Sequence, residues 1–180
     1  AQIIVAQTER ITRVVRQLLQ LARPHTHELR PAEPVACVRE VVELLELEAR
    51  RREAILRLDA AAAGRVDINP DAIQQIVFNL VRNSLAALSP GGTVVIRVRV
   101  EPAVGQGPRR LLIVVADDGR GMSDEVQARA FEPFFTTRSH TGGVGLGLTV
   151  VRSLVESMRG TVVAEARPGG GTEITVRMPC

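Results

Sequence analysis

Hydrophobic residues recur at helical spacing in four stretches of the chain. In the first, residues 4 to 22, Ile4, Ile11 and Leu18 lie seven positions apart, which is typical of an amphipathic helix that packs against another helix. Proline cannot continue a helix, so Pro24 ends this one. The remaining stretches predict helices over residues 35 to 52, 70 to 88 and 149 to 158, and Asn69 followed by proline is a typical helix start.

Val- and Ile-rich stretches between these helices predict short strands, because β-branched side chains favour extended backbone. They cover residues 55–58, 65–68, 93–100, 111–116, 161–166 and 173–178. Turns are expected at residues 60–64, 102–108 and 169–171, and the second of these connects two antiparallel strands. Helices on one side of a mostly antiparallel sheet predict an α+β fold, a two-layer α/β sandwich.

Composition limits both the architecture and the partners. A chain of 180 residues that is 45% hydrophobic can bury one substantial core, with room for a helical extension. Its basic residues are all arginine and are interleaved with acidic ones, and the aromatic content is 2%. Nucleic-acid binding is not expected, because it needs a basic surface or aromatic side chains that stack on bases. We expect a helix over residues 1–24, a linker over residues 25–34 and one globular domain over residues 35–180.

Cysteine content and hydropathy indicate the setting of the chain. Cys37 and Cys180 are too few and too far apart for a disulfide framework or a zinc site, which fits a reducing, cytoplasmic environment. No stretch approaches the ~20 apolar residues of a membrane span. The chain begins with Ala1, so we expect a fragment of a longer protein, which leaves room for a membrane anchor elsewhere.

Two asparagines form the first block with chemical potential. Asn79 and Asn83 are four residues apart, so both project from one face of the expected helix. Asparagine is a poor helix former, and two on one face cost stability unless they serve a purpose there. A pair of exposed surface amides is the alternative.

A second block, residues 117–121, directly follows a hydrophobic strand. Its sequence, Asp-Asp-Gly-Arg-Gly, places carboxylates at the strand end beside glycines that let a ligand approach the backbone. A purely structural turn would show much the same residues, so this block alone leaves function open.

The third and fourth blocks are rich in phenylalanine and glycine. Phe131, Phe134 and Phe135 are three of the four phenylalanines, and on their own they predict a small hydrophobic cluster. Residues 142–147 hold four glycines directly before the last helix. Main-chain N–H groups at a helix start bind phosphate, whereas a flexible loop without a ligand is the alternative.

In this order, the four blocks resemble the N, G1, F and G2 boxes of the ATP-binding domain of sensor histidine kinases, which have the Bergerat fold of the GHKL superfamily. Residues 131–137 are similar to kinases of the nitrogen-regulation type. The resemblance implies a domain that binds ATP and Mg²⁺ and transfers the γ-phosphoryl group to a histidine on the dimerisation domain of the same protein. A response regulator receiver domain would then accept it. Residues 1–24 would be the end of a dimerisation-hairpin helix, whose heptad spacing favours a homodimer.

The resemblance also implies roles for individual residues. Asn83 would ligate Mg²⁺, and Asp117 would accept a hydrogen bond from the adenine amine. Asn79 stands where related ATPases that hydrolyse ATP carry glutamate, and because an amide cannot activate water, transfer to a protein group is favoured. Asn79 and Asn83 are thus the expected catalytic residues. The nucleotide-binding residues implied are Asn79, Arg82, Asn83, Asp117, Gly119, Gly121, Phe134, Thr137, Arg138, Gly143, Gly145, Leu146, Gly147, Leu148 and Thr172.

Five of these residues have more specific expected roles. Gly145 and Gly147 would cradle the phosphates in a glycine-rich lid, which Thr172 would support from the following glycine-threonine pair. Arg138 stands where lysine is common in the family, and its guanidinium can still meet phosphate. Gly121 would keep the wall of the adenine pocket thin.

The phosphoacceptor histidine does not fit the family pattern. His27 lies in a sequence one residue shorter than the acceptor motif, and the residues before it resemble the end of the second hairpin helix rather than the first. We therefore expect the acceptor outside this chain and little autophosphorylation of the chain alone. His25 and His140 are expected at the surface of the linker and the lid.

Other nucleotide-binding families fit less well. The chain has no lysine, whereas P-loop proteins and eukaryotic-type kinases both need a lysine that contacts phosphate. A clamp ATPase of the chaperone or mismatch-repair type would carry glutamate at Asn79. A regulatory ATP-binding module or an anti-sigma-like serine kinase, which would hold a partner with its N-terminal helix, stays open as the alternative.

Overall fold

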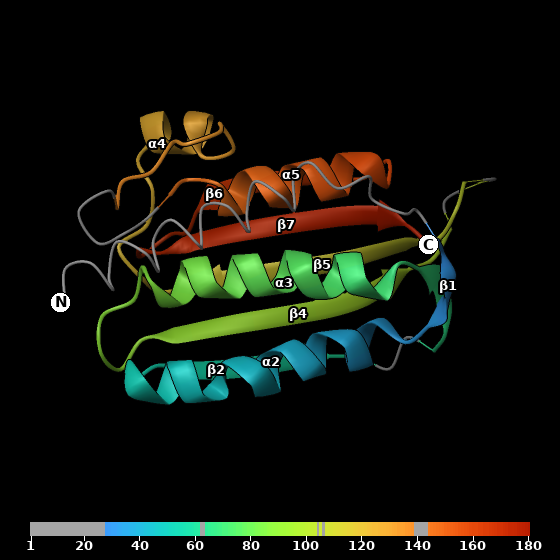
Figure 1. The fold of residues 1–180 in the computed structure, drawn as a ribbon, viewed down its shortest axis with the longest axis horizontal. Helices are drawn as coiled ribbons and strands as arrows, with labels where there is room; N and C mark the ends of the chain where they lie inside the picture. Colours follow the sequence, from blue (N-terminus) through green and yellow to red (C-terminus); the bar gives the residue numbers. More distant parts are fainter. Residues whose placement is uncertain (1–27, 62–63, 104, 106, 139–143) are drawn as a thin grey trace, which may run out of the picture.

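The computed structural model describes residues 28–61, 64–103, 105, 107–138 and 144–180. In this part of the chain, helices α2 (Pro34–Arg51), α3 (Pro70–Leu85) and α5 (Gly147–Ser157) cover one face of a five-stranded sheet (Figure 1). A shorter helix, α4 (Asp124–Arg129), lies at one end of this sandwich. The expected α+β fold with two layers is confirmed.

The large sheet has the strand order β2-β4-β5-β7-β6. Its strands are β2 (Ile55–Ala60), β4 (Thr93–Glu101), β5 (Arg110–Asp117), β6 (Thr161–Ala166) and β7 (Thr172–Pro179). Strand β2 runs parallel to β4, and the other neighbouring pairs are antiparallel. The predicted hairpin of β4 and β5 is confirmed, as is the mostly antiparallel sheet.

Alternating side chains decide which face of the sheet meets the helices. In β5, Leu111, Ile113 and Val115 are at most 1% exposed and belong to the core that the three helices complete. Asp117 lies on the same face, because residues two apart in a strand share a face. The row of apolar side chains on β5 therefore ends in a carboxylate at the margin of the core.

Helix α3 lies between α2 and α5 and contacts both of them as well as β5. Its start follows the sequence prediction: Pro70 is in the first turn, and the side chain of Asn69 accepts a hydrogen bond from the Ala72 N–H at 3.0 Å. One side of α3 is fully buried, including Ile76 and Leu80. The C-terminal half of α3 is thus packed into the core, and it reaches the same end of the sandwich as α4.

Two features of the N-terminal half differ from expectation. The strands on either side of residues 60–64 belong to different sheets, because β3 (Val66–Ile68) pairs with β1 (Arg30–Ala32) and β2 joins the large sheet. Strand β1 lies in the segment expected to be a linker, and main-chain pairing of this kind leaves little trace in side-chain pattern. The pattern does not predict α4 either, because six residues are too few to show helical periodicity.

Several expectations concern residues outside the described part of the chain. These are the helix over residues 4–22, its place in a dimerisation hairpin, and the positions of His25, His27, His140 and Gly143. Among the described residues, none of the helices combines the length and the hydropathy that crossing a membrane requires.

Candidate functional site

A cleft of about 510 Å³ opens at the end of the sandwich where α3 ends and α5 begins. All four sequence blocks contribute to its walls. The predicted residues that line it are Asn79, Arg82, Asn83, Asp117, Gly121, Thr137, Arg138, Gly145, Leu146, Gly147, Leu148 and Thr172. Gly119 and Phe134 are described but do not line the cleft, and Gly143 lies outside the described residues.

Asp117 is 3% exposed and occupies the end of β5. The Ser84 hydroxyl donates to its Oδ2 at 2.8 Å, and the main-chain N–H groups of Gly119 and Thr172 donate to its Oδ1 at 3.1 and 3.2 Å. A carboxylate has about four acceptor positions, so Oδ2 can accept one further hydrogen bond. The three donors hold the carboxylate in one orientation, ready for a donor group of a ligand in the cleft.

Thr172 reaches Asp117 because β7 begins directly against the end of β5. The residue before it, Gly171, has φ +93°, and a Cβ there would lie 1.9 Å from the main-chain oxygen of Asp117. The Arg167 guanidinium donates to this same oxygen at 2.7 Å. Thr172 therefore supports the carboxylate of Asp117. Its expected support of the glycine-rich lid stays a prediction.

Asn79 and Asn83 are half-buried and face the start of α5. A Cβ on Gly147 would lie 3.5 Å from Asn79 Oδ1 and 3.4 Å from Asn83 Nδ2. The Asn79 amide donates to the carbonyl of Gln75 at 2.9 Å. Asn83 Oδ1 accepts a hydrogen bond from the Arg138 guanidinium, also at 2.9 Å. The alternative of two exposed surface amides is therefore wrong.

Positive charge gathers around this pair of amides. Burial lowers the pKa of the Arg138 guanidinium, and the nearby charges of Arg120, Arg52 and Arg82 lower it further. All four arginines line the cleft, and Arg120 donates to the Thr137 hydroxyl at 3.0 Å. Like charges brought together in a cleft favour the binding of an anion that carries several negative charges.

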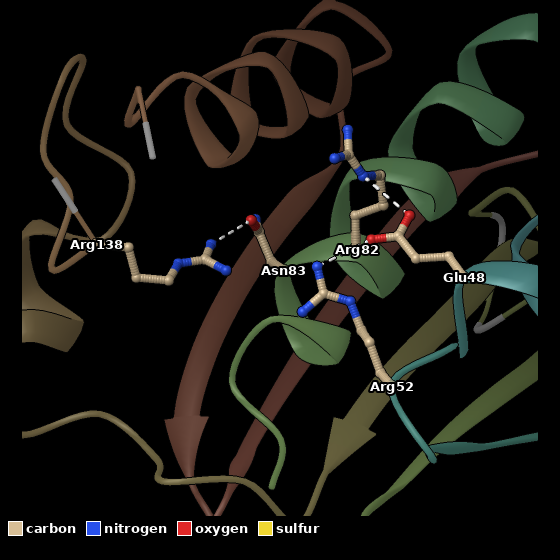
Figure 2. A network of polar contacts seen from close by, with 5 residues as sticks. All are labelled: Glu48, Arg52, Arg82, Asn83 and Arg138. Atoms are coloured by element: carbon tan, nitrogen blue, oxygen red, sulfur yellow. Dashed lines mark hydrogen bonds and ion pairs between the residues drawn. The ribbon is translucent and has the colours of Figure 1, made fainter. Parts of the chain in front are cut away.

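Ion pairs connect α2 with α3 at the same place. Glu48 Oε1 lies 3.2 Å from Arg52, and Glu48 Oε2 lies 3.5 Å from Nε of Arg82. Figure 2 shows Asn83 between this group and Arg138. Sequence motifs do not identify Glu48 or Arg52, because a glutamate and an arginine four residues apart are common on the surface of any helix.

The phenylalanine block and the glycine block are locked together by main-chain contacts. Phe134 has φ +65°, and its N–H donates to the carbonyl of Gly145 at 3.0 Å. A Cβ at Gly145 would lie 2.5 Å from main-chain atoms of both Phe134 and Phe135. Gly145 is thus required for this close approach, in addition to any role toward phosphate.

The expected phenylalanine cluster does not include Phe134. Phe134 is 61% exposed, so the prediction is wrong for this residue. Phe135 is half-buried and lines the cleft, with the Arg129 guanidinium 4.4 Å from the centre of its ring.

The sequence motifs do not predict the hydrogen bond that Ser84 makes at the buried end of the cleft. Ser84 directly follows Asn83, is 4% exposed, and gives its hydroxyl to Asp117. A serine inside a helix is a weak signal for such a role, because its hydroxyl competes with the helix backbone and gains little there. The partner, 33 residues away, cannot be read from local pattern.

The residues present fit a magnesium ion held largely by phosphate. Within the described ranges, no group of three or more His, Cys, Asp or Glu could hold a metal. Asn79 and Asn83 both line the cleft, and Asn83 Oδ1 already accepts a hydrogen bond from a cationic group. Mg²⁺ accepts oxygen ligands of this kind and takes the rest from water and substrate phosphates.

Comparison with known proteins agrees with this site. Residues 68–180 match the family described as histidine kinase-, DNA gyrase B- and HSP90-like ATPase. Sensor histidine kinase ZraS of Klebsiella oxytoca is 33% identical over 180 residues, which are 99% of this chain and 37% of that protein. Sensory histidine kinase/phosphatase NtrB of the same organism is 32% identical over 183 residues, covering 99% of this chain and 51% of NtrB. The chain thus spans about half or less of the length of these curated relatives.

Solved structures show the same fold. The catalytic domain of histidine kinase ThkA superposes with a TM-score of 0.72 at 25% identity, over 84% of this chain and 95% of that one. ThkA in complex with response regulator protein TrrA gives a TM-score of 0.78 at 23% identity, over 98% of this chain and 49% of that one. The chain therefore belongs to the histidine kinase-, DNA gyrase B- and HSP90-like ATPases, and within them to the ATP-binding catalytic domains of sensor histidine kinases.

Proposed function

We propose that the cleft binds ATP with Mg²⁺ and presents the γ-phosphoryl group to a histidine on the dimerisation domain of the same protein, within a homodimer. The receiver domain of a response regulator then accepts it. The observation that carries this proposal is the pairing, in one cleft, of a buried acceptor carboxylate, Asp117, with a group of arginines. The first suits the amine of adenine and the second suits the phosphates. The relative ZraS is named a sensor histidine kinase, which supports a histidine as the acceptor. The complex of ThkA with response regulator protein TrrA supports a response regulator as the partner.

Positioning and electrostatics supply the catalysis, because phosphoryl transfer requires little covalent chemistry from the protein. Asp117 orients the purine, and Arg82 and Arg138 reduce the charge of the phosphates. The main-chain N–H groups at the start of α5, from Gly147 and Leu148, add donors for phosphate. Asn83, with Asn79 beside it, would hold Mg²⁺, which when bound neutralises part of the phosphate charge.

Asn79 separates this proposal from its rivals. A clamp ATPase needs a carboxylate at this position to activate water, and the amide of Asn79 cannot take that proton. The relatives named sensor histidine kinases do not favour the alternative of an anti-sigma-like serine kinase.

Calorimetric titration of the chain with ATP, with and without Mg²⁺, tests the binding step. We expect saturable binding to ATP that Mg²⁺ strengthens, and a chain with no affinity for adenine nucleotides would overturn the proposal. A second experiment supplies γ-labelled ATP together with a histidine-bearing dimerisation domain from a close relative. Label should appear on the supplied domain; label on His27 of the chain alone would contradict the assignment of the acceptor.

A further inference from the structure

Helix α2 and its C-cap residue contribute two charged side chains to the cleft, and neither belongs to the four blocks that identify the domain. Glu48 and Arg52 both line the cleft. Arg52 caps the C-terminus of α2, one turn after Glu48, and the two side chains pair at 3.2 Å. They are 31% and 44% exposed, so this pair is only partly open to solvent.

The same carboxylate holds a second arginine from a different helix. Glu48 Oε2 lies 3.5 Å from Nε of Arg82 on α3. A single carboxylate neutralises one guanidinium, and each guanidinium has five N–H donors, most of which Glu48 cannot engage. An ion pair that only fastened α2 to α3 would need one arginine, so the second adds charge and donors toward the cleft.

The surplus charge reaches the space around Asn83. Arg52 and Arg82 are among the charges that lower the pKa of Arg138, which bonds Asn83 from the other side. Figure 2 shows Asn83 between the guanidinium of Arg138 and the group of Glu48, Arg52 and Arg82. Guanidinium groups that converge in this way repel one another until a polyanion lies between them.

We propose that Arg52, positioned by Glu48 beside Arg82, is a further phosphate-binding residue of this cleft and contacts the distal phosphates of the nucleotide. This inference rests on the proposed function and adds α2 to the elements that bind ATP. Glu48 acts as a positioning residue: it holds the guanidinium of Arg52 toward the cleft and touches no ligand itself.

Arg50 provides a matched control on the same helix. It makes the same kind of ion pair four residues apart, with Glu46 at 3.1 Å, but its side chain is 78% exposed and does not line the cleft. The test compares Arg52→Gln with Arg50→Gln in the chain of 180 residues. Affinities for Mg-ATP and for AMP are measured by calorimetry at low and at high salt, and thermal unfolding checks that each variant is folded.

We expect Arg52→Gln to weaken ATP binding about fivefold at low salt and to change AMP binding less than about twofold, because AMP has no distal phosphates. The loss should shrink at high salt, since partly exposed charges are screened. Arg52→Lys keeps the positive charge and should recover part of the ATP affinity, although not the fork geometry of the guanidinium. Arg50→Gln should leave both affinities within about twofold of wild type.

Two results would overturn the inference. One is equal ATP affinity in Arg52→Gln and Arg50→Gln; the other is an equal loss of ATP and AMP affinity in Arg52→Gln, which would indicate a general disturbance of the cleft. In both cases the wild-type chain still binds ATP, so the proposed function survives. If the wild-type chain binds no ATP, the proposed function itself has failed.

Discussion

The two ends of the cleft are built in opposite ways. At the end where we propose that adenine binds, called the adenine end below, the buried carboxylate of Asp117 accepts three hydrogen bonds, from Ser84, Gly119 and Thr172. At the end where we propose that the phosphates bind, called the phosphate end below, long and partly exposed cationic side chains make ion pairs or hydrogen bonds with their neighbours. They belong to Arg52, Arg82, Arg120 and Arg138, and Asn83 lies among them. We therefore expect the first arrangement to be the more rigid of the two.

Because of this difference, we expect one end of the cleft to select the base of the nucleotide and the other end to attract its phosphates. Salt screens a buried hydrogen bond to a charged group much less than it screens a surface contact, and a ligand that lacks the matching donor leaves one acceptor position of the carboxylate unfilled. Partly exposed guanidinium groups attract any polyphosphate, and salt weakens that attraction. We therefore expect the adenine end to decide which nucleotide binds and the phosphate end to decide how strongly its charge contributes.

The largest effect is expected where the adenine end depends on close main-chain packing. Gly171→Ala places a Cβ 1.9 Å from the main-chain oxygen of Asp117 at φ +93°, so β7 must move away from β5. Gly169→Ala is the matched control, because Gly169 has φ +85° but nothing within 4 Å of the added atom. Both changes strain the backbone, and only the first also forces a displacement.

We expect Gly171→Ala to lower the free energy of unfolding by about 2 kcal/mol more than Gly169→Ala does, and to abolish ATP binding. Urea denaturation followed by circular dichroism measures the first quantity, and calorimetry measures the second. Equal destabilisation by the two changes would show that the contact between Gly171 and Asp117 is not tight in solution.

Asp117→Asn should have the next largest effect. An amide at this position replaces one carboxylate oxygen with a donor, so the buried group can no longer accept all three protein hydrogen bonds and one from adenine. A hydrogen bond to a charged group contributes about 1.5–3 kcal/mol, and ATP affinity should fall by about ten- to a hundredfold. Discrimination between ATP and inosine triphosphate, which lacks the amine, should largely disappear.

Calorimetry at two salt concentrations sharpens this prediction. The loss caused by Asp117→Asn should be the same at both, unlike the loss expected for Arg52→Gln. A loss that shrinks with salt would place Asp117 among the screened charges and remove the contrast between the two ends.

The predictions from the sequence agree best with the structure where a feature depends on residues that are close together in the chain. Asn69 caps α3 as its sequence predicts, and Asn79 and Asn83 share a face because they are four residues apart. The contacts that orient these groups join distant segments: Ser84 with Asp117, Arg138 with Asn83, and Glu48 with Arg82. The first and third pairs follow from the packing of α3 against β5 and α2, and the second joins α3 to the loop after the phenylalanine block. Periodicity alone specifies none of them.

Periodicity likewise predicts the elements of the fold better than the contacts between distant segments. The pattern identifies most of the helices and strands, including the hairpin of β4 and β5. It does not reveal that β3 pairs with β1, because that pairing is made by main-chain groups of two three-residue strands. It also misreads Phe134, whose exposed side chain follows from a main-chain bond to Gly145 that hydrophobicity cannot predict.

Asn83→Ala should change the response to Mg²⁺ more than the affinity itself. The substitution removes an amide oxygen that suits Mg²⁺, and it also removes the acceptor that holds Arg138. We expect the strengthening of ATP binding by Mg²⁺ to fall to less than about threefold, whereas affinity without Mg²⁺ stays within about threefold of wild type. A full Mg²⁺ response in this variant, measured by calorimetry, would show that the metal is held elsewhere.

The smallest effect is expected for Ser84→Ala, which removes one of the three hydrogen bonds to Asp117 and leaves the carboxylate in place. A net contribution of about 0.5–1.5 kcal/mol corresponds to a loss of roughly two- to tenfold in ATP affinity. Ser157→Ala, whose hydroxyl bonds the Leu154 carbonyl outside the cleft, is the control and should not change affinity. Calorimetry with ATP and inosine triphosphate separates two meanings of the loss. If Ser84 orients the carboxylate, the preference for ATP over inosine triphosphate falls together with the affinity. If the affinities for both nucleotides fall equally, the two remaining main-chain donors are sufficient to orient Asp117. The adenine end would then depend on main-chain contacts alone for its rigidity.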